Sequence, residues 1–184
     1  MAVELLRRHF TSDEYHAMAQ AGILSADDRV ELIEGEIFEM TPIGNRHAGG
    51  VNRLTHLFRP VTGAVLSVQN PVHLSDFSEP QPDVALLRPR NDFYAQSHAT
   101  PGEILLLVEV ADASLEADRR KKIPLYARHG VAEAWLVDLI RSVLEVYREA
   151  TPQGYLDVRQ LRHGDRITPL AFPDLSLDVA AILG

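Results

Sequence analysis

Apolar residues recur along the chain with more than one period, and each period predicts a different element. Within residues 47–59, Val51, Leu54 and Phe58 follow one another at i, i+3 and i+7, which is the spacing of one helix face. Residues 104–110 are nearly all apolar, as expected of a strand covered on both faces at the centre of a sheet. The chain is therefore expected to combine helices with a buried sheet.

End signals predict two further helices. Thr11 and Glu14 have the spacing of a capping box, so a short helix is expected over residues 11–21. A longer helix is predicted over residues 114–129, followed by glycine. Pro124 conflicts with it, because a proline inside a helix costs about 3 kcal/mol and removes a hydrogen bond. We expect a kink there or a helix that begins later.

The strand predictions fix the fold class. A hairpin is expected over residues 30–40, turning near Glu34 and Gly35. Strands are predicted at 64–69, 72–74, 83–87, 104–110, 134–137 and 143–147, with a loop at 88–102. The last forty residues alternate weakly, and their apolar end is expected at the sheet edge. This order predicts one α/β domain over residues 1–184, with a mixed central β-sheet flanked by α-helices.

Composition restricts the function. The 18 Lys and Arg against 26 Asp and Glu give a net charge of −8, which argues against coating nucleic acid by bulk charge. Six of the acids lie within residues 27–39. The absence of Cys excludes zinc ribbons, thiol catalysis and disulfides. No apolar run has the length of a signal peptide or membrane span, so a cytoplasmic protein is expected.

Two acids stand beside apolar strands, where a carboxylate needs a partner or a metal to offset its desolvation. Asp83 opens the strand predicted over residues 83–87, and Glu109 closes the apolar run that begins at Ile104. If the strands are neighbours, both carboxylates could bind one Mg²⁺ or Mn²⁺ ion. The alternative is that Asp83 caps the turn after Pro82 and Glu109 forms an ion pair with an arginine.

A basic cluster ending at Lys122 follows in the next helix, and a lysine there could orient an attacking water. Lys122 shares a helix stripe with Leu115 and Tyr126, whereas Lys121 points about 100° away. The stripe favours Lys122 as the residue that faces the sheet. The alternative is an i, i+4 pair between Asp118 and Lys122 on a solvated helix face.

The order of these acids and the lysine resembles the active-site signature of the PD-(D/E)XK nuclease superfamily. More closely, the chain resembles the Uma-two (Uma2) family of restriction-endonuclease-like proteins at residues 30–36, 79–87, 107–110, 118–122 and 125–131. The superfamily places its lysine two residues after the glutamate, where this chain has Ala111. The family is expected to supply the lysine from the following helix, at Lys122.

The resemblance implies a restriction-endonuclease-like fold and hydrolysis of nucleic-acid phosphodiester bonds, with DNA as the expected substrate and Mg (or Mn) as cofactor. The implied catalytic residues are Asp83, Glu109, Lys122 and Glu31, and the implied metal ligands are Asp83, Glu109 and Glu31. Glu36 competes with Glu31 for that place. His47 is a possible auxiliary residue that contacts phosphate or a carboxylate. The other seven histidines show no metal-ligand spacing and receive no role.

A second hypothesis keeps the same fold without efficient catalysis. The protein would then be a catalytically weak or inactive scaffold that binds a partner or itself, since a fold does not determine a function. A homodimer is expected under either hypothesis. The hairpin that follows Trp135 could place an edge strand at a two-fold interface, with burial of this tryptophan in the core as the alternative.

Overall fold

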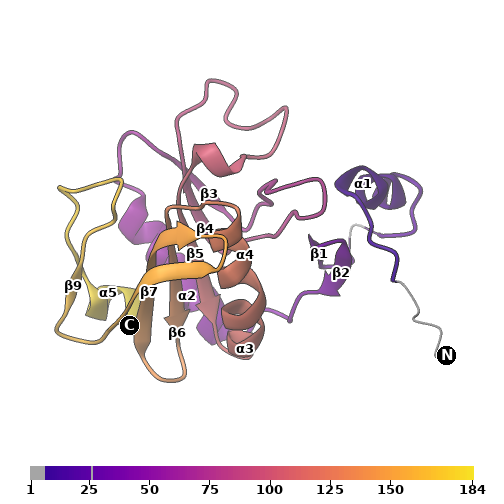
Figure 1. The fold of residues 1–184 in the computed structure, drawn as a ribbon. Coiled ribbons are helices and arrows are strands. Elements are labelled where there is room, and N and C mark those ends of the chain that lie inside the picture. The colour runs from indigo at the N-terminus through magenta and orange to yellow at the C-terminus, as the bar shows by residue number, and fades with distance from the viewer. Residues whose placement is uncertain (1–6, 26) are drawn as a thin grey trace.

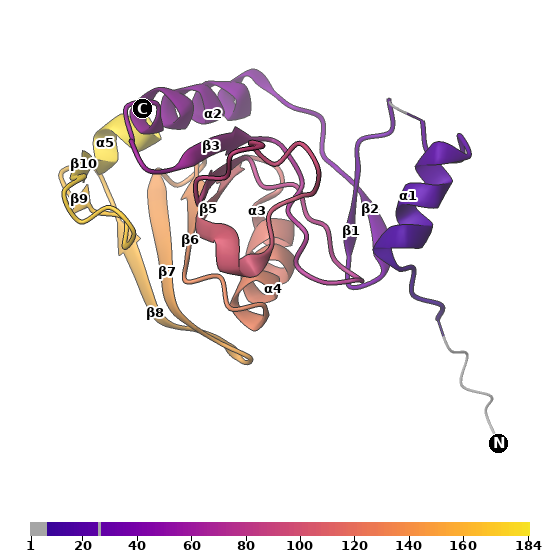
Figure 2. The ribbon, with the colours of Figure 1, turned by 90° about the horizontal axis from the view of Figure 1, so that it is seen from above.

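The structure, a computed structural model, describes residues 7–25 and 27–184 and shows a six-stranded sheet with helices on both faces (Figures 1 and 2). Residues 1–6, to which part of the signal-peptide expectation applies, lie outside this description. The strands are β3 (Val65–Val68), β4 (Val84–Leu87), β5 (Ile104–Ala111), β6 (Glu133–Asp138), β7 (Val143–Thr151) and β8 (Gly154–Leu161), paired in that order. β5 and β6 are parallel, and the other neighbours are antiparallel. The predicted mixed sheet is confirmed.

Alternate residues of β5 enter two different cores. Leu106, Val108 and Val110 pack with α2 (Asn45–Phe58) and α5 (Val179–Leu183) on one face. Leu107 and Ala111 pack on the other face with the helical crossover that joins β5 to β6. Glu109 has the parity of this second set, so strand alternation directs its side chain toward the crossover.

The crossover is a helix interrupted by a π turn. It consists of α3 (Leu115–Ala117), the π turn η2 (Asp118–Lys122) and α4 (Ile123–Arg128). Pro124 occupies the first turn of α4 and cannot donate an amide hydrogen bond. The wider turn directly before it makes room for the proline ring. π turns of this kind are frequently found at functional sites. The disturbance predicted at the proline is therefore a π turn.

The N-terminal elements lie to one side of the main sheet (Figure 2). They are α1 (Ser12–Gln20), capped by Thr11 and Glu14 as predicted, and the hairpin of β1 (Val30–Ile33) and β2 (Glu36–Glu39). The hairpin turns at Glu34 and Gly35, both with positive φ. A single antiparallel bridge joins Leu32 to Glu79, and thereby holds the hairpin against the segment that leads into β4.

The structure corrects three details of the sequence prediction. Residues 72–74 form no strand, because Val72 makes only one bridge, to Ala99, and the chain turns back at once. β8 was not predicted, since its residues are mostly half-exposed or exposed and carry little apolar alternation. The chain beyond it passes through the antiparallel pair β9 (Arg166–Ile167) and β10 (Leu177–Asp178). It ends in α5, beside α2 on the sheet face and not at its edge.

The structure also bears on the expectations about Trp135 and about a membrane span. Trp135 is fully buried beside Phe58, so the core alternative for this tryptophan is the one observed. Among residues 7–25 and 27–184, none of the helices combines the length and apolar character that a bilayer crossing demands. A 3₁₀ turn, η1 (Pro101–Glu103), completes the described elements and leads directly into β5.

Gly50 sets how closely α2 approaches the sheet. A Cβ atom added there would lie 2.7 Å from Val110 Cγ1, whereas one added at Gly49 would meet only Arg53 Nη1, at 3.6 Å. We expect Gly50→Ala to destabilise the protein by about 1–3 kcal/mol through overpacking. Gly49→Ala should stabilise it by about 0.5–1 kcal/mol, because alanine is the better helix former. Urea unfolding of both variants checks this, and equal effects would contradict the assigned contact.

Candidate active site

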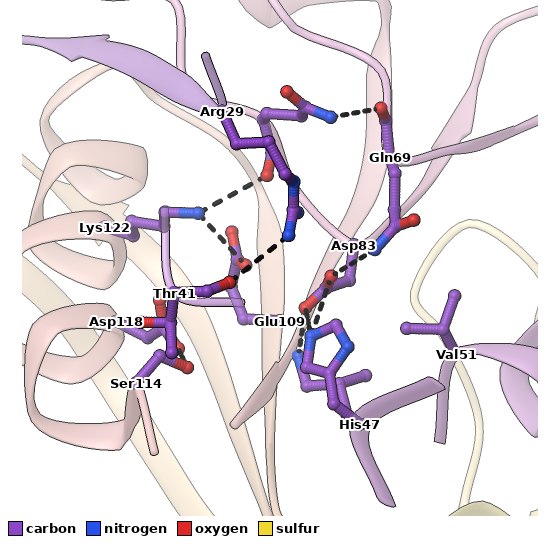
Figure 3. Close-up of polar contacts among 12 residues, drawn as sticks. Arg29, Thr41, His47, Val51, Gln69, Asp83, Glu109, Ser114, Asp118 and Lys122 are labelled. Carbon is purple, nitrogen blue, oxygen red and sulfur yellow. Dashed lines mark hydrogen bonds and ion pairs between the residues drawn. The ribbon is translucent and has the colours of Figure 1, made fainter. Parts of the chain in front are cut away.

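Asp83 directly precedes β4, and Glu109 lies on β5, the adjacent antiparallel strand. Val84 of β4 pairs with Val108 of β5. Because the strands are antiparallel, the residue before Val84 lies opposite the residue after Val108. Asp83 and Glu109 therefore stand side by side on the same face of the sheet. Both line a pocket of about 270 Å³, together with Glu31 from the hairpin and Lys122 from the π turn. Figure 3 shows Lys122 extending toward Glu109, with Asp83 close by. The predicted neighbourhood of the two acid-bearing strands is confirmed.

The Asp83 carboxylate is held by three segments. It accepts hydrogen bonds from the Val110 backbone amide at 2.8 Å, from His47 Nε2 at 3.0 Å and from Gln69 Nε2 at 3.3 Å. None of these donors belongs to the turn after Pro82, so the turn-capping alternative is not observed. These contacts hold the carboxylate in place at the start of β4, where it lines the pocket.

Glu109 is 2% exposed and shares its two oxygens between two partners. Tyr126 donates its hydroxyl hydrogen bond to Oε1, and the Lys122 ammonium lies 3.4 Å from Oε2. Burial raises the pKa of Glu109 well above its usual range, and the nearby ammonium offsets this only in part. The ion-pair alternative is correct in kind, but the partner is a lysine rather than an arginine.

Lys122 connects two acids. Its Nζ lies 3.0 Å from Glu31 Oε2 and 3.4 Å from Glu109 Oε2, and it donates to the Gln81 carbonyl at 3.4 Å. Burial by itself would lower the pKa of Lys122, but the adjacent carboxylates outweigh burial and raise it. The side chain therefore stays charged.

The solvated-helix alternative for Asp118 and Lys122 is wrong. Both residues are buried, and Asp118 accepts its hydrogen bond from Ser114 Oγ at 2.6 Å. Lys121 instead lies exposed over the Phe38 ring, 3.6 Å from its centroid. The helix stripe thus predicted correctly which of the two lysines faces the sheet.

His47, at the start of α2, faces Asp83 with Nε2, while its buried Nδ1 has no partner among the described residues. The hydrogen bond to Asp83 raises the pKa of His47, against the opposite effect of burial. Glu31 accepts from the Gln81 backbone amide at 3.0 Å in addition to its contact with Lys122. Glu36 lies at the surface with Arg7, so of the two competing acids Glu31 is the one that lines the pocket.

Sequence reasoning missed several residues of the pocket. Tyr126 was identified only as part of the helix stripe, Asp118 only as a surface acid, and Arg29 not at all, although it lines the pocket beside Lys121. The basic cluster is also divided, since Arg119 pairs with Glu145 of β7 at 2.7 Å. A contact between a tyrosine and an acid 17 residues apart leaves no periodic signal in the sequence.

The pocket holds more acidic than basic buried groups. Four acids there are buried, and one buried ammonium faces them: Glu31 7%, Asp83 8%, Glu109 2% and Asp118 5% exposed, against Lys122 at 7%. In residues 7–25 and 27–184 the oxygens of the three implied ligands do not all lie within 4.8 Å of one another. Mg²⁺ usually takes one or two protein carboxylates and keeps several waters. The oxygen donors and the excess charge therefore fit a hard divalent cation held by two acids.

Comparisons with known proteins identify the family and the fold of the chain. The family described as "Uma2: Putative restriction endonuclease" matches residues 12–180. A crystal structure of a "putative nuclease" from Anabaena variabilis superposes with a TM-score of 0.71, at 17% identity, over 95% of this chain and 97% of that one. At this identity the structural match shows the fold alone. No curated protein matches the chain.

Removing the lysine should leave Glu31 and Glu109 buried without a counter-charge. We expect Lys122→Met to lower the unfolding free energy by about 3–5 kcal/mol at neutral pH. The control Lys121→Met should lower it by less than about 1 kcal/mol.

The raised pKa of Glu109 also predicts the direction in which the stability of Lys122→Met changes with pH. Glu109 has a folded-state pKa raised above its usual 4.5, so its folded form binds the proton more tightly than the unfolded form. The stability of Lys122→Met should therefore fall as the pH rises from about 4.5 through the raised value. Urea unfolding between pH 5 and pH 8 measures this slope, and a variant whose stability rises over that range would contradict the assigned burial.

Proposed function

The chain belongs to the Uma2 family, and from this premise we propose that it is a metal-dependent nuclease that hydrolyses phosphodiester bonds, with DNA as substrate. The observation that carries the proposal is the pocket in which Asp83 and Glu109 stand side by side next to the buried ammonium of Lys122. A protein that used this fold only as a scaffold would have no physical reason to bury acids in excess of their counter-charges.

Asp83 and Glu109 are the proposed ligands of Mg²⁺ or Mn²⁺, with Glu31 adding to the site through water. A bound divalent cation would supply charge stabilisation to the phosphoryl oxygens. The His47 and Val110 contacts support the role of Asp83, because they hold its carboxylate in one orientation. Tyr126 orients the Glu109 carboxylate in the same way.

Lys122 is the proposed water-positioning residue. Its raised pKa keeps it protonated, so it would act as a hydrogen-bond donor to the attacking water and not as the base that removes a proton. Glu31 holds the ammonium at 3.0 Å and the Gln81 carbonyl limits its movement. The π turn supports this role, because it is the element that brings Lys122 to the sheet in place of the residue at Ala111.

The proposed substrate must approach an acidic chain. Arg29 and Lys121 line the pocket, and both are exposed where they could contact backbone phosphates. The net charge of −8 limits this attraction to short range. Binding of DNA is therefore expected to be weak, dependent on the metal and sensitive to salt.

Calorimetry with Mg²⁺ and Mn²⁺ tests the metal site. We expect one divalent ion to bind the unaltered protein, and Asp83→Asn and Glu109→Gln each to abolish the binding because each removes a charged oxygen ligand. The matched control is Asp112→Asn, which changes a partly exposed acid of the same pocket and should leave the binding intact. Equal binding by Asp83→Asn and the unaltered protein would refute the ligand assignment.

Cleavage of plasmid and single-stranded DNA with Mn²⁺ tests the activity. A metal worth several kcal/mol of charge stabilisation predicts a loss of about 10²-fold or more in Glu109→Gln. The Asp112→Asn control should cleave normally, and a chelator should stop the reaction. Metal binding without any cleavage would favour the alternative, a catalytically inactive scaffold that binds a partner.

Self-association through β8 is a second part of the proposal. β8 lies at an edge of the main sheet, and its Leu156 and Val158 are 71% and 52% exposed. Two copies that pair this edge around a two-fold axis would cover the strand's free backbone groups.

Light scattering after size-exclusion chromatography tests the homodimer. We expect the unaltered protein to be a dimer and Val158→Lys to be a monomer, because a charge is unfavourable in the paired edge. The control Leu170→Lys changes an equally exposed residue outside β8 and should remain dimeric. A monomeric unaltered protein would end this part of the proposal.

A further inference from the structure

Three residues distant in sequence meet outside the active-site pocket. They are His16 of α1, Glu79 before β4 and His98 before η1, and their donor atoms all lie within 4.8 Å of one another. The spacing of the histidines along the chain suggested no metal site, and that expectation changes once the chain is folded. The cluster is distinct from the pocket of Asp83 and Glu109, because it lines a separate cleft of about 540 Å³.

The carboxylate of Glu79 is the centre of this cluster. It is 6% exposed, and it faces His16 Nε2 at 2.6 Å through Oε2 and His73 Nδ1 at 2.8 Å through Oε1. The rings of His16 and His98 have centroids 6.3 Å apart and lie on the cleft. One buried acid is thus surrounded by imidazoles that open toward solvent, which gives an ion a path of entry.

The donor set differs from that of the pocket in chemical type. Imidazole nitrogens together with one carboxylate suit borderline metals such as Zn²⁺, whereas carboxylate oxygens alone suit Mg²⁺. Tetrahedral Zn²⁺ with bonds of about 2.0–2.1 Å would separate its ligand atoms by about 3.4 Å. The distance between His16 Nε2 and Glu79 Oε2 is shorter than this value, and the 4.8 Å within which all three donor atoms lie is longer. Small side-chain rotations would therefore bring the three donors into place.

We propose that His16, Glu79 and His98 form a binding site for a divalent transition-metal ion of the Zn²⁺ type, with His73 orienting the Glu79 carboxylate through its contact with Oε1. Water completes the coordination on the open side. The His73 contact fits this arrangement, because hydrogen bonds to the second oxygen of a ligating carboxylate orient it toward the metal.

The site would cross-link α1 to the segment that supports Glu31. The Glu79 amide donates to the Leu32 carbonyl at 2.8 Å, and two residues later the Gln81 amide donates to Glu31 Oε2. α1 is otherwise fixed here by the Ser12 amide, which donates to the Asp76 carbonyl at 2.7 Å, and by the hydroxyl of Tyr15 on the Val30 carbonyl. The inference does not depend on nuclease activity, since it concerns ion binding and the attachment of α1.

The test is Co²⁺ and Zn²⁺ titration of chelator-treated protein from which any affinity tag has been removed. We expect one equivalent of Co²⁺ to give the visible absorption of a low-symmetry site, and Zn²⁺ to displace it. His16→Ala and His98→Ala should each weaken the binding at least tenfold. The control His56→Ala changes an exposed histidine of α2 and should bind like the unaltered protein.

A second comparison separates this site from the active-site pocket. Asp83→Asn should keep the Co²⁺ absorption, whereas the proposed Mg²⁺ binding is lost in that variant. Retention of the visible Co²⁺ absorption in either histidine variant, or its loss in Asp83→Asn, would overturn the assignment. Circular dichroism without metal serves as the folding control, and His98→Gln replaces His98→Ala if that variant does not fold.

Discussion

One lysine ammonium must balance several carboxylates in a part of the protein that water scarcely reaches. Lys122 is 7% exposed and contacts both Glu31 and Glu109, while Asp83 and Asp118 are buried nearby. An ion pair of this kind is favourable only when its geometry is good and its remaining polar atoms are hydrogen-bonded. The placement of the surrounding elements follows from that requirement.

Several segments contribute to this balance. β4 and β5 are adjacent and in register, so the two strand-borne acids lie on one face. The hairpin reaches the site through the bridge between Leu32 and Glu79, which brings Glu31 to the ammonium. The π turn before Pro124 delivers the lysine, and Gly50 lets α2 approach β5 closely enough for His47 to contact Asp83. A change in any of these segments would alter the charges that face Lys122.

The sequence predicts those parts of the site that depend on short-range periodicity. The acids at the ends of two apolar strands were predicted to meet if those strands are neighbours, as they are, and helix geometry distinguished Lys122 from Lys121. β8 was missed because its half-exposed residues carry little apolar alternation, and the strand at 72–74 was predicted where Val72 makes only one bridge. Contacts between distant segments, such as Tyr126 with Glu109 or His16 with Glu79, arise from the tertiary fold and have no local pattern.

In the proposed active site, a divalent cation on Asp83 and Glu109 balances the buried acids that outnumber Lys122. The most direct test is crystallographic, with crystals grown in Mn²⁺ and data collected to locate its anomalous scattering. We expect one anomalous peak between the Asp83 and Glu109 carboxylates, with the Lys122 ammonium beside it. No peak in this pocket at saturating Mn²⁺, with the two carboxylates ordered and Lys122 still paired to Glu31 and Glu109, would contradict this proposal.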